Sequence, residues 1–370
     1  MEKLLNQLGL GTRIIALSLI PLLISLLFAT SSAYDARKLA EEATDINTLA
    51  VYAPIISSVV HELQKERGRT AGYIGSGGAG RAELEEQRKS TEQAIRLLQE
   101  ENSKFNYVSF DQSFANIVQN YQTALSRLDA TRKSVNDQDI TVAQMASYYS
   151  STIAKLLDTI KSMVQMSNDA DISRRITAYV NLLEAKERAG QERAMGNSGY
   201  ASGQFSPAIY KRFVELVAVQ NAFIGNFNEY ASKESAAYYE RTLKGPAVSK
   251  VQAMRDHTFS TQGNVGTDTY DSRDWFNQIT TKINLLKQVE DHVNNEILTS
   301  TESLMADASS TFWFLTISLI IGTIVLLGFT FAVFRSVATP LETLESTMES
   351  LSTGNLETHV PYIDYGSSIG

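Results

Sequence analysis

Two arginines continue the apolar faces of predicted helices, which suits them to binding an anion. The apolar spacing of residues 49–63, in steps of three and four, leads on to Arg67. In a second stretch, the apolar stripe of residues 172–183 leads on through Gly190 to Arg193. Burying a guanidinium is costly unless a negative group meets it, and its planar fork of donors suits planar oxyanions. The spacing therefore predicts two inward-facing arginines that need an anionic partner.

The sequence leaves two interpretations of that partner open. In the first, a small anion binds between the arginines. In the second, carboxylates of the chain itself form buried ion pairs with them, and Glu66, Glu187 and Glu192 are the candidates along the chain. The residue types alone do not decide between a ligand site and a structural pair.

The two arginine-containing segments echo each other. HELQKERGRTAGYIG and LLEAKERAGQERAMG both contain Lys-Glu-Arg followed by small residues and a glycine-containing end. A small residue such as Gly190 would let a neighbouring helix or a ligand approach closely. The candidate ligand-binding residues in these two segments are Arg67, Gly68, Arg69, Arg188, Gly190 and Arg193.

The elements that position these residues are predicted to be helices. From residue 35 to residue 308, apolar residues recur at helical spacing and no segment shows sustained strand alternation. The sequence predicts an all-α domain, either one long bundle or two four-helix bundles stacked end to end. The predicted helices cover about residues 49–74, 81–101, 105–134, 141–166, 171–196, 207–231 and 274–308.

The last of these helices carries a seam of apolar residues near heptad spacing, which Glu290 and Ser300 interrupt. The seam consists of Ile283, Leu286, Val293, Ile297 and Leu304. Such a seam fits the core of a single chain, and it equally fits the stalk of a homodimer.

Two uncharged apolar runs flank the predicted domain. A helix of about 20 apolar residues crosses the hydrocarbon core of a bilayer, and only a helix satisfies its own backbone polar groups there. Both runs are long enough to do so. The sequence therefore predicts an N-terminal segment at 1–13, a membrane helix at 14–34, the helical domain at 35–308, a second membrane helix at 309–334 and a final segment at 335–370.

Basic residues near the apolar runs predict the orientation of the chain. Lys3 and Arg13 precede the first run, and Arg335 follows the second. Because short cytoplasmic segments carry an excess of Lys and Arg, both chain ends are expected in the cytoplasm. The helical domain is then expected on the other side of the cytoplasmic membrane, in the periplasm.

The segment after the second run resembles the start of a HAMP linker, the parallel coiled-coil module that joins receptors to their outputs. Its Pro340, its Gly-Asn-Leu run and its final Ile-Gly match that module. The usual acidic pair before Ile-Gly is replaced here by Ser367-Ser368. The resemblance implies that the chain stops before the second HAMP helix, and that a missing output domain would contact cytoplasmic signalling partners.

Composition argues against several classes of protein. Without cysteine the chain has no disulfide, thiolate nucleophile or zinc–sulfur site. Its formal net charge of −8 argues against nucleic acid as a partner. The four histidines are scattered without paired-ligand spacing, and no nucleophile–base constellation stands out. We therefore expect no enzyme activity, no metal site and no cofactor.

The chain from about residue 45 to residue 300 resembles the NIT domain, the nitrate- and nitrite-sensing module. The ERG turn, EAKERAGQERAMG and FSPAIYKRFVELVAVQNAFIGNFNEYA carry this resemblance. It implies two four-helix bundles that bind nitrate or nitrite through arginines from separate helices. Matched by motif, these arginines are Arg67, Arg193 and, in VQAMRDHTF, Arg255. Some members have two adjacent arginines at the first motif, where this chain has Arg67-Gly68.

Together these features predict a homodimeric transmembrane receptor, in contact with membrane lipid, that senses nitrate or nitrite in the periplasm. Ligand binding would shift helices of the outer domain, move the second membrane helix and bias the HAMP linker. The expected output is that of a methyl-accepting chemotaxis protein. The alternatives are a receptor of the same fold for another small anion, such as a carboxylate, and a structural or interaction domain whose arginines are satisfied by its own carboxylates.

Overall fold

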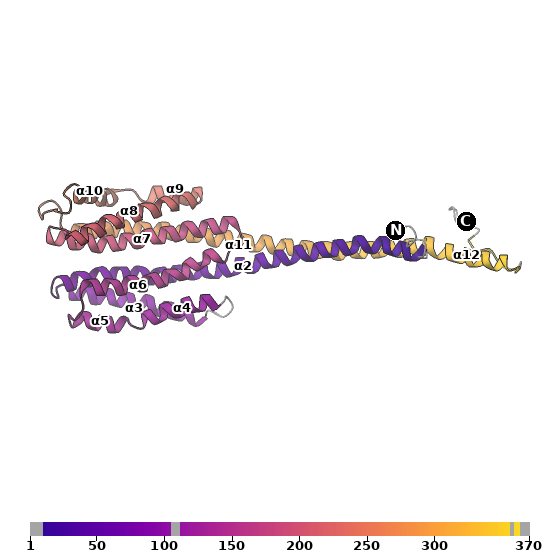
Figure 1. The fold of residues 1–370 in the computed structure, drawn as a ribbon, viewed down its shortest axis with the longest axis horizontal. Coiled ribbons are helices and arrows are strands. Elements are labelled where there is room, and N and C mark those ends of the chain that lie inside the picture. Colours follow the sequence, from indigo (N-terminus) through magenta and orange to yellow (C-terminus); the bar gives the residue numbers. More distant parts are fainter. Residues whose placement is uncertain (1–9, 105–111, 356–358, 363–370) are drawn as a thin grey trace. The chain divides into compact units, whose positions relative to one another are not determined.

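The structure is a computed structural model that describes residues 10–104, 112–355 and 359–362. Every regular element in those residues is a helix, which confirms the predicted all-α fold (Figure 1). The chain divides into two compact units. Residues 41–305 form one unit, and residues 1–40 together with 306–370 form the other. The arginines of interest all belong to the first unit.

The first half of the 41–305 unit contains the predicted helix order, with one difference. Its helices are α2 (Leu10–Gly75), α3 (Arg81–Lys104), α4 (Gln112–Leu125), α5 (Leu128–Asn136) and α6 (Val142–Lys161). The predicted 105–134 helix is divided between α4 and α5, and residues 105–111 lie outside the described part of the chain. At the division, the Ser126 hydroxyl donates to the Thr123 carbonyl at 2.9 Å, a local bond that competes with continued helix.

The second half repeats this pattern. Its helices are α7 (Ala170–Ser202), α8 (Pro207–Tyr230), α9 (Lys233–Thr242), α10 (Pro246–Ser260) and α11 (Ser272–Val333). Ser206 caps α8 by accepting from the Ile209 N–H, and Pro207 is in the first turn, as the Ser-Pro pair predicts. The short helix α9 was not expected as a separate element. Gly245, with a φ of 115°, separates it from α10.

The two halves form two helical bundles that lie side by side rather than end to end. Figure 1 shows α3 to α6 with α2 in one group and α7 to α10 with α11 in the other. Hydrogen bonds join the groups along their length. Asn294 on α11 donates to the Ala50 carbonyl on α2 at 2.9 Å, and Lys186 on α7 donates to Ser57 on α2 at 3.2 Å. The long helices α2, α7 and α11 therefore position any site between the bundles.

The near-heptad seam of α11 belongs to the core of the single chain. Ile283, Leu286, Val293 and Ile297 are at most 2 % exposed. Burying each such side chain contributes about 1.5–3 kcal/mol, so the packing accounts for the seam without a second copy. Glu290, which interrupts it, forms a buried ion pair with Lys186.

Two glycines allow aromatic side chains to pack against α7. A Cβ at Gly196 would overlap the indole of Trp275, and a Cβ at Gly199 would overlap the ring of Phe205. Trp275 also donates its Nε1–H to the carbonyl of Arg193 at 3.0 Å. The position of α7 near Arg193 is thus fixed by close packing that only glycine permits.

The remaining unit contains the ends of the two longest helices. The stretches Leu19–Gly75 and Ser272–Ser352 each contain a window that is long and apolar enough to cross a membrane, by length and composition. Side chains in these windows are largely exposed, as Phe28 and Phe314 illustrate at 72 % and 71 %. The predicted membrane run and the first domain helix form one continuous helix, α2, and the last domain helix likewise continues through α11.

After α11 the chain forms a π-helical turn and then α12 (Thr339–Ser352), with Pro340 in its first turn. Proline suits this position because the first helical N–H groups have no partner within the helix. Gly354, with a φ of 92°, follows the end of α12, where a left-handed residue commonly ends a helix. The Ser367-Ser368 pair and the final Ile-Gly lie outside the described residues.

Candidate functional site

Arg67 and Arg193 lie on adjacent helices, and each faces a glycine of the other helix. A Cβ at Gly190 on α7 would be 3.1 Å from Arg67 Nη2. A Cβ at Gly68 on α2 would be 3.6 Å from Arg193 Nε. Both arginines are 1 % exposed. The structure therefore brings together four of the residues that the sequence singles out.

A carboxylate of the chain already holds Arg67. Arg67 Nη1 donates to Glu187 Oε1 at 2.7 Å, and Nη2 donates to Oε2 at 3.3 Å. Nη1 also donates to the Ser150 hydroxyl at 2.7 Å, and Gln64 Nε2 donates to Glu187 Oε2 at 2.8 Å. For Arg67, the structure therefore shows the buried ion pair with a carboxylate of the chain itself that the sequence left open as the second interpretation.

Arg193 has neutral partners instead. Its Nη2 donates to the Gln64 carbonyl at 2.8 Å, and its Nη1 donates to the Thr280 hydroxyl at 3.0 Å. The ring of Phe276 lies 5.0 Å from its guanidinium carbon. Within the described part of the chain, no carboxylate forms an ion pair with Arg193. Burial, and then the charge of Arg67, lower the pKa of Arg193 to about 9.

The charge of Glu187 opposes this lowering of the pKa of Arg193, but its effect is smaller than that of Arg67. Burial, followed by the charges of Lys186, Lys65 and Arg193, lowers the pKa of His61 to about 2. His61 is therefore neutral at ordinary pH. Arg69 is exposed, and its charge also lowers the pKa of Arg193. The surroundings of Arg193 are consequently electropositive.

Several buried polar atoms beside the two arginines make no hydrogen bond in the described residues. They include Arg67 Nε, Arg193 Nε and His61 Nδ1. Unpaired buried donors are rare in folded proteins, and each costs about 1–3 kcal/mol. The two free Nε–H groups could donate to an oxyanion. Since both guanidinium groups are buried, an anion reaches them only when α2 and α7 part locally or a side chain moves.

Arg255 occupies a different cluster, inside the second bundle. Its Nε and Nη2 donate to the two oxygens of Glu192, each at 2.6 Å, and Nη2 also donates to Gln220 at 2.9 Å. Lys282 donates to the same Gln220 oxygen at 2.8 Å. Burial, and then the charge of Arg255, lower the pKa of Lys282 to about 7. Although Glu192 and Arg193 are consecutive, the structure does not place Arg255 among the contacts of Arg193.

Arg188 is also separate from the pair formed by Arg67 and Arg193. It forms an ion pair with Glu184 at 2.9 Å, one turn earlier on α7. Its guanidinium lies 5.5 Å from the centre of the Phe223 ring on α8. This side chain therefore faces α8 rather than α2.

Sequence reasoning missed a second buried ion pair, in the first bundle. Arg132 on α5 donates to Glu66 through Nε at 2.8 Å and Nη2 at 2.9 Å, and the Tyr149 hydroxyl donates to Glu66 at 2.8 Å. The ion pair of Glu66 with Arg132 resembles that of Glu192 with Arg255, because each glutamate accepts two hydrogen bonds from one guanidinium. In the Glu-Arg dipeptides at 66–67 and 192–193, the glutamate pairs inside its own bundle and the arginine faces the other bundle. Glu-Arg also occurs at 187–188 and 240–241, and Glu187 pairs across the bundles with Arg67, so the dipeptide alone did not identify this pair.

Comparison with known proteins supports a sensing role. Residues 58–298 match the family model described as nitrate and nitrite sensing (NIT). A nitrate regulatory protein of Klebsiella oxytoca is 27 % identical over 257 residues, covering 68 % of this chain and 62 % of that protein. The solved structure of the NasR transcription antiterminator has a TM-score of 0.65 and 21 % identity, covering 87 % of this chain and 88 % of that one. The likeness to the NasR structure shows the fold. The chain spans less than two thirds of the Klebsiella oxytoca protein.

These comparisons overturn one expectation from composition and agree with another. The prediction that excludes nucleic acid as a partner is wrong, because a protein of the same fold is a transcription antiterminator. Net charge is summed over the whole chain, so it does not exclude a nucleic-acid contact made by one surface or by a separate domain. Both similar proteins are named as regulators rather than as enzymes, which agrees with the expectation of no enzyme activity.

Proposed function

The chain belongs to the NIT family of nitrate- and nitrite-sensing domains, and from that premise we propose that it is a receptor that binds nitrate or nitrite between α2 and α7. Arg193 is the group that holds the anion. The observation that carries this assignment is that Arg193 is buried, charged and without a carboxylate in the described residues, whereas Arg67 and Arg255 each have one.

The chemistry of the anion suits this position. Nitrate and nitrite are small, planar and singly charged, and a guanidinium donates two parallel hydrogen bonds to such a group. A buried cation gains most from an added counterion because the surroundings screen the interaction poorly. The free Nε–H groups of Arg193 and Arg67 would supply donors from two helices.

Glu187 couples anion binding to helix packing. It accepts from both Nη groups of Arg67, so an anion that binds those groups as well as Arg193 must displace this carboxylate. Displacement would break a contact between α2 and α7 and form another through the anion. A ligand that binds one helix arrangement better than the other shifts the population toward it.

The membrane part of the proposal rests on the two apolar stretches. The apolar windows of α2 and α11 are 6 % and 0 % buried, unlike the core helix of a compact domain. We infer that they cross the cytoplasmic membrane, with the 41–305 unit in the periplasm and α12 in the cytoplasm as the first helix of a HAMP linker. Movement of α11 would then carry the signal to an output domain.

A second candidate function has one observation in its favour. Arg67, Arg132 and Arg255 are each held by a buried glutamate, which is the pattern of a structural domain. Under that candidate, Arg193 has only a packing role against Phe276 and the Gln64 carbonyl.

A receptor of the same fold for a small carboxylate would use the same arginines.

Calorimetry on the purified chain in detergent separates these candidates. Nitrate and nitrite should release heat with saturation, whereas chloride, acetate and succinate should not. Losing a hydrogen bond to a charged group costs about 1.5–3 kcal/mol, so Arg193→Gln should weaken nitrate binding about 10- to 150-fold. Arg193→Lys, which keeps the charge without the fork, should bind between the two.

The matched control is Arg174→Gln, an exposed arginine on the same helix. It should bind nitrate as the unaltered chain does. Heat with carboxylates alone would favour the carboxylate receptor. Unchanged nitrate binding in Arg193→Gln would overturn the assignment of Arg193, and the absence of any anion response would favour the structural domain.

A further inference from the structure

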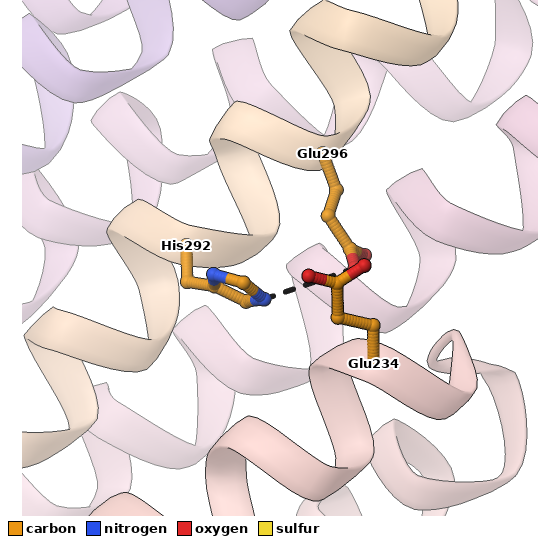
Figure 2. Close-up of side chains that lie close together, drawn as sticks. All are labelled: Glu234, His292 and Glu296. Carbon is orange, nitrogen blue, oxygen red and sulfur yellow. Dashed lines mark ion pairs between the residues drawn. The ribbon is translucent and has the colours of Figure 1, made fainter.

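A histidine and two glutamates gather between α9 and α11, away from the arginine site. His292 and Glu296 are one turn apart on α11, and Glu234 is in the first turn of α9 (Figure 2). One ligand atom from each residue can be chosen so that all three lie within 4.8 Å of one another. Figure 2 shows the imidazole and both carboxylates directed toward one point.

The imidazole is oriented for ligation and lacks a hydrogen-bond partner at the atom that faces the glutamates. His292 Nε2 is buried and makes no hydrogen bond within the described residues. It lies 3.7 Å from Glu296 Oε1, beyond hydrogen-bond distance. The ring of Tyr238 stacks on the imidazole with 4.1 Å between centroids, which fixes the plane of His292.

Hydrogen bonds from other side chains hold the carboxylate of Glu296. Ser235 donates to Oε2 at 2.7 Å, and Arg175 donates to the same oxygen at 3.3 Å. Ser232, the cap of α9, donates to both oxygens at 2.9 and 2.8 Å. Carboxylates that bind metal ions are commonly held by such outer hydrogen bonds. Oε1, which accepts from Ser232 alone among these donors, is the oxygen that lies 3.7 Å from His292 Nε2.

We propose that Glu234, His292 and Glu296 form a site for a divalent transition-metal ion of the zinc class. One imidazole nitrogen with two carboxylate oxygens is a ligand set that zinc accepts, whereas calcium and magnesium prefer oxygen alone. A small inward movement of the exposed Glu234 side chain would complete three protein ligands, and water would fill the open position. The spacing His292-x-x-x-Glu296 was the signal in the sequence, because residues four apart share a helix face.

The ion would join α9 to α11 without taking part in anion binding. Because α11 continues to Val333 as one helix, a metal bridge at its middle would restrain the element that we propose carries the signal. The site itself stands on its own residues, independently of the nitrate proposal.

Zinc binding to the tag-free purified chain tests this inference, with competition against a chromophoric chelator as the readout. We expect one zinc per chain and a rise in melting temperature, because a ligand that binds only the folded state stabilises it. Removing even an outer-shell partner of a metal site costs about 10–100-fold in metal affinity, and His292 and Glu234 are proposed as direct ligands. His292→Ala and Glu234→Gln should therefore each weaken zinc binding at least tenfold.

Two variants serve as controls. His359→Ala removes an exposed histidine outside the 41–305 unit, and Glu240→Gln removes another exposed carboxylate of α9. Both should retain wild-type zinc affinity. Zinc binding that is equally strong in His292→Ala and Glu234→Gln, or a chain that binds no zinc, would overturn the proposal. Because nitrate titration of the same variants reports the other site, failure of one proposal is distinguishable from failure of the other.

Discussion

Arg67 on α2 donates to both carboxylate oxygens of Glu187 on α7, at 2.7 and 3.3 Å. Six residues further along α7, Arg193 donates instead to a backbone carbonyl of α2 and to a threonine hydroxyl. The two guanidinium groups thus share one contact region with a single carboxylate between them. This asymmetry makes Glu187 an internal competitor for any anion that binds there.

Replacing Glu187 by Gln should make the domain less stable and more responsive to nitrate. Removing one partner of a buried ion pair costs about 3–5 kcal/mol because the other charge is left uncompensated. Nitrate can then occupy Arg67 as well as Arg193. Thermal unfolding with and without nitrate should show a lower melting temperature and a larger nitrate-induced rise than in the unaltered chain. The exposed Glu215→Gln should show neither, and a smaller nitrate-induced rise in Glu187→Gln would contradict the competition.

Two glycine-to-alanine substitutions should have opposite effects on stability. Gly196→Ala forces a Cβ into the indole of Trp275, and overpacking of this kind costs about 1–3 kcal/mol. Gly72→Ala, inside α2, meets no atom within 4 Å and should stabilise the chain by about 0.5–1 kcal/mol, since alanine has the higher helix propensity. Urea unfolding measures both. Equal effects of the two substitutions would show that the close packing of α7 against Trp275 is unimportant.

His61 should make the domain sensitive to acid. Its pKa is lowered from 6.5 to about 2 in the folded chain, so between these values the unfolded chain binds more protons than the folded chain. The contribution of His61 to the free energy of unfolding is therefore fully present above pH 6.5. It is lost as the pH drops toward 2, by at most about 1.4 kcal/mol per pH unit. His61→Gln should reduce that slope.

Urea unfolding at several pH values between 4 and 8, spanning ~6.5, the ordinary pKa of histidine, would measure the slope. His359→Gln, an exposed histidine near the chain end, is the control and should leave it unchanged. If His61→Gln and the unaltered chain show an identical pH dependence, the pKa of His61 is not lowered in the folded chain and this prediction is wrong.

Local sequence determined the helices and the direction in which the key side chains point. The predicted start of the 207–231 helix and the predicted end of the 49–74 helix match α8 and α2 within one residue, because caps and breaks depend on neighbouring residues only. The apolar spacing before Arg67 and Arg193 correctly placed both side chains in the interior. Helical periodicity fixes which residues share a face, and that information is contained within a few turns.

Tertiary structure decided the partners of those side chains. Arg67 meets Glu187 across 120 residues, and Arg132 meets Glu66 across 66. Arg255, which the family resemblance groups with Arg67 and Arg193, pairs with Glu192 in another cluster. Which inward carboxylate faces which guanidinium depends on how far one helix slides and turns against the next. Packing of the whole core sets that register, as where Gly196 admits Trp275, and no local pattern in the sequence contains it.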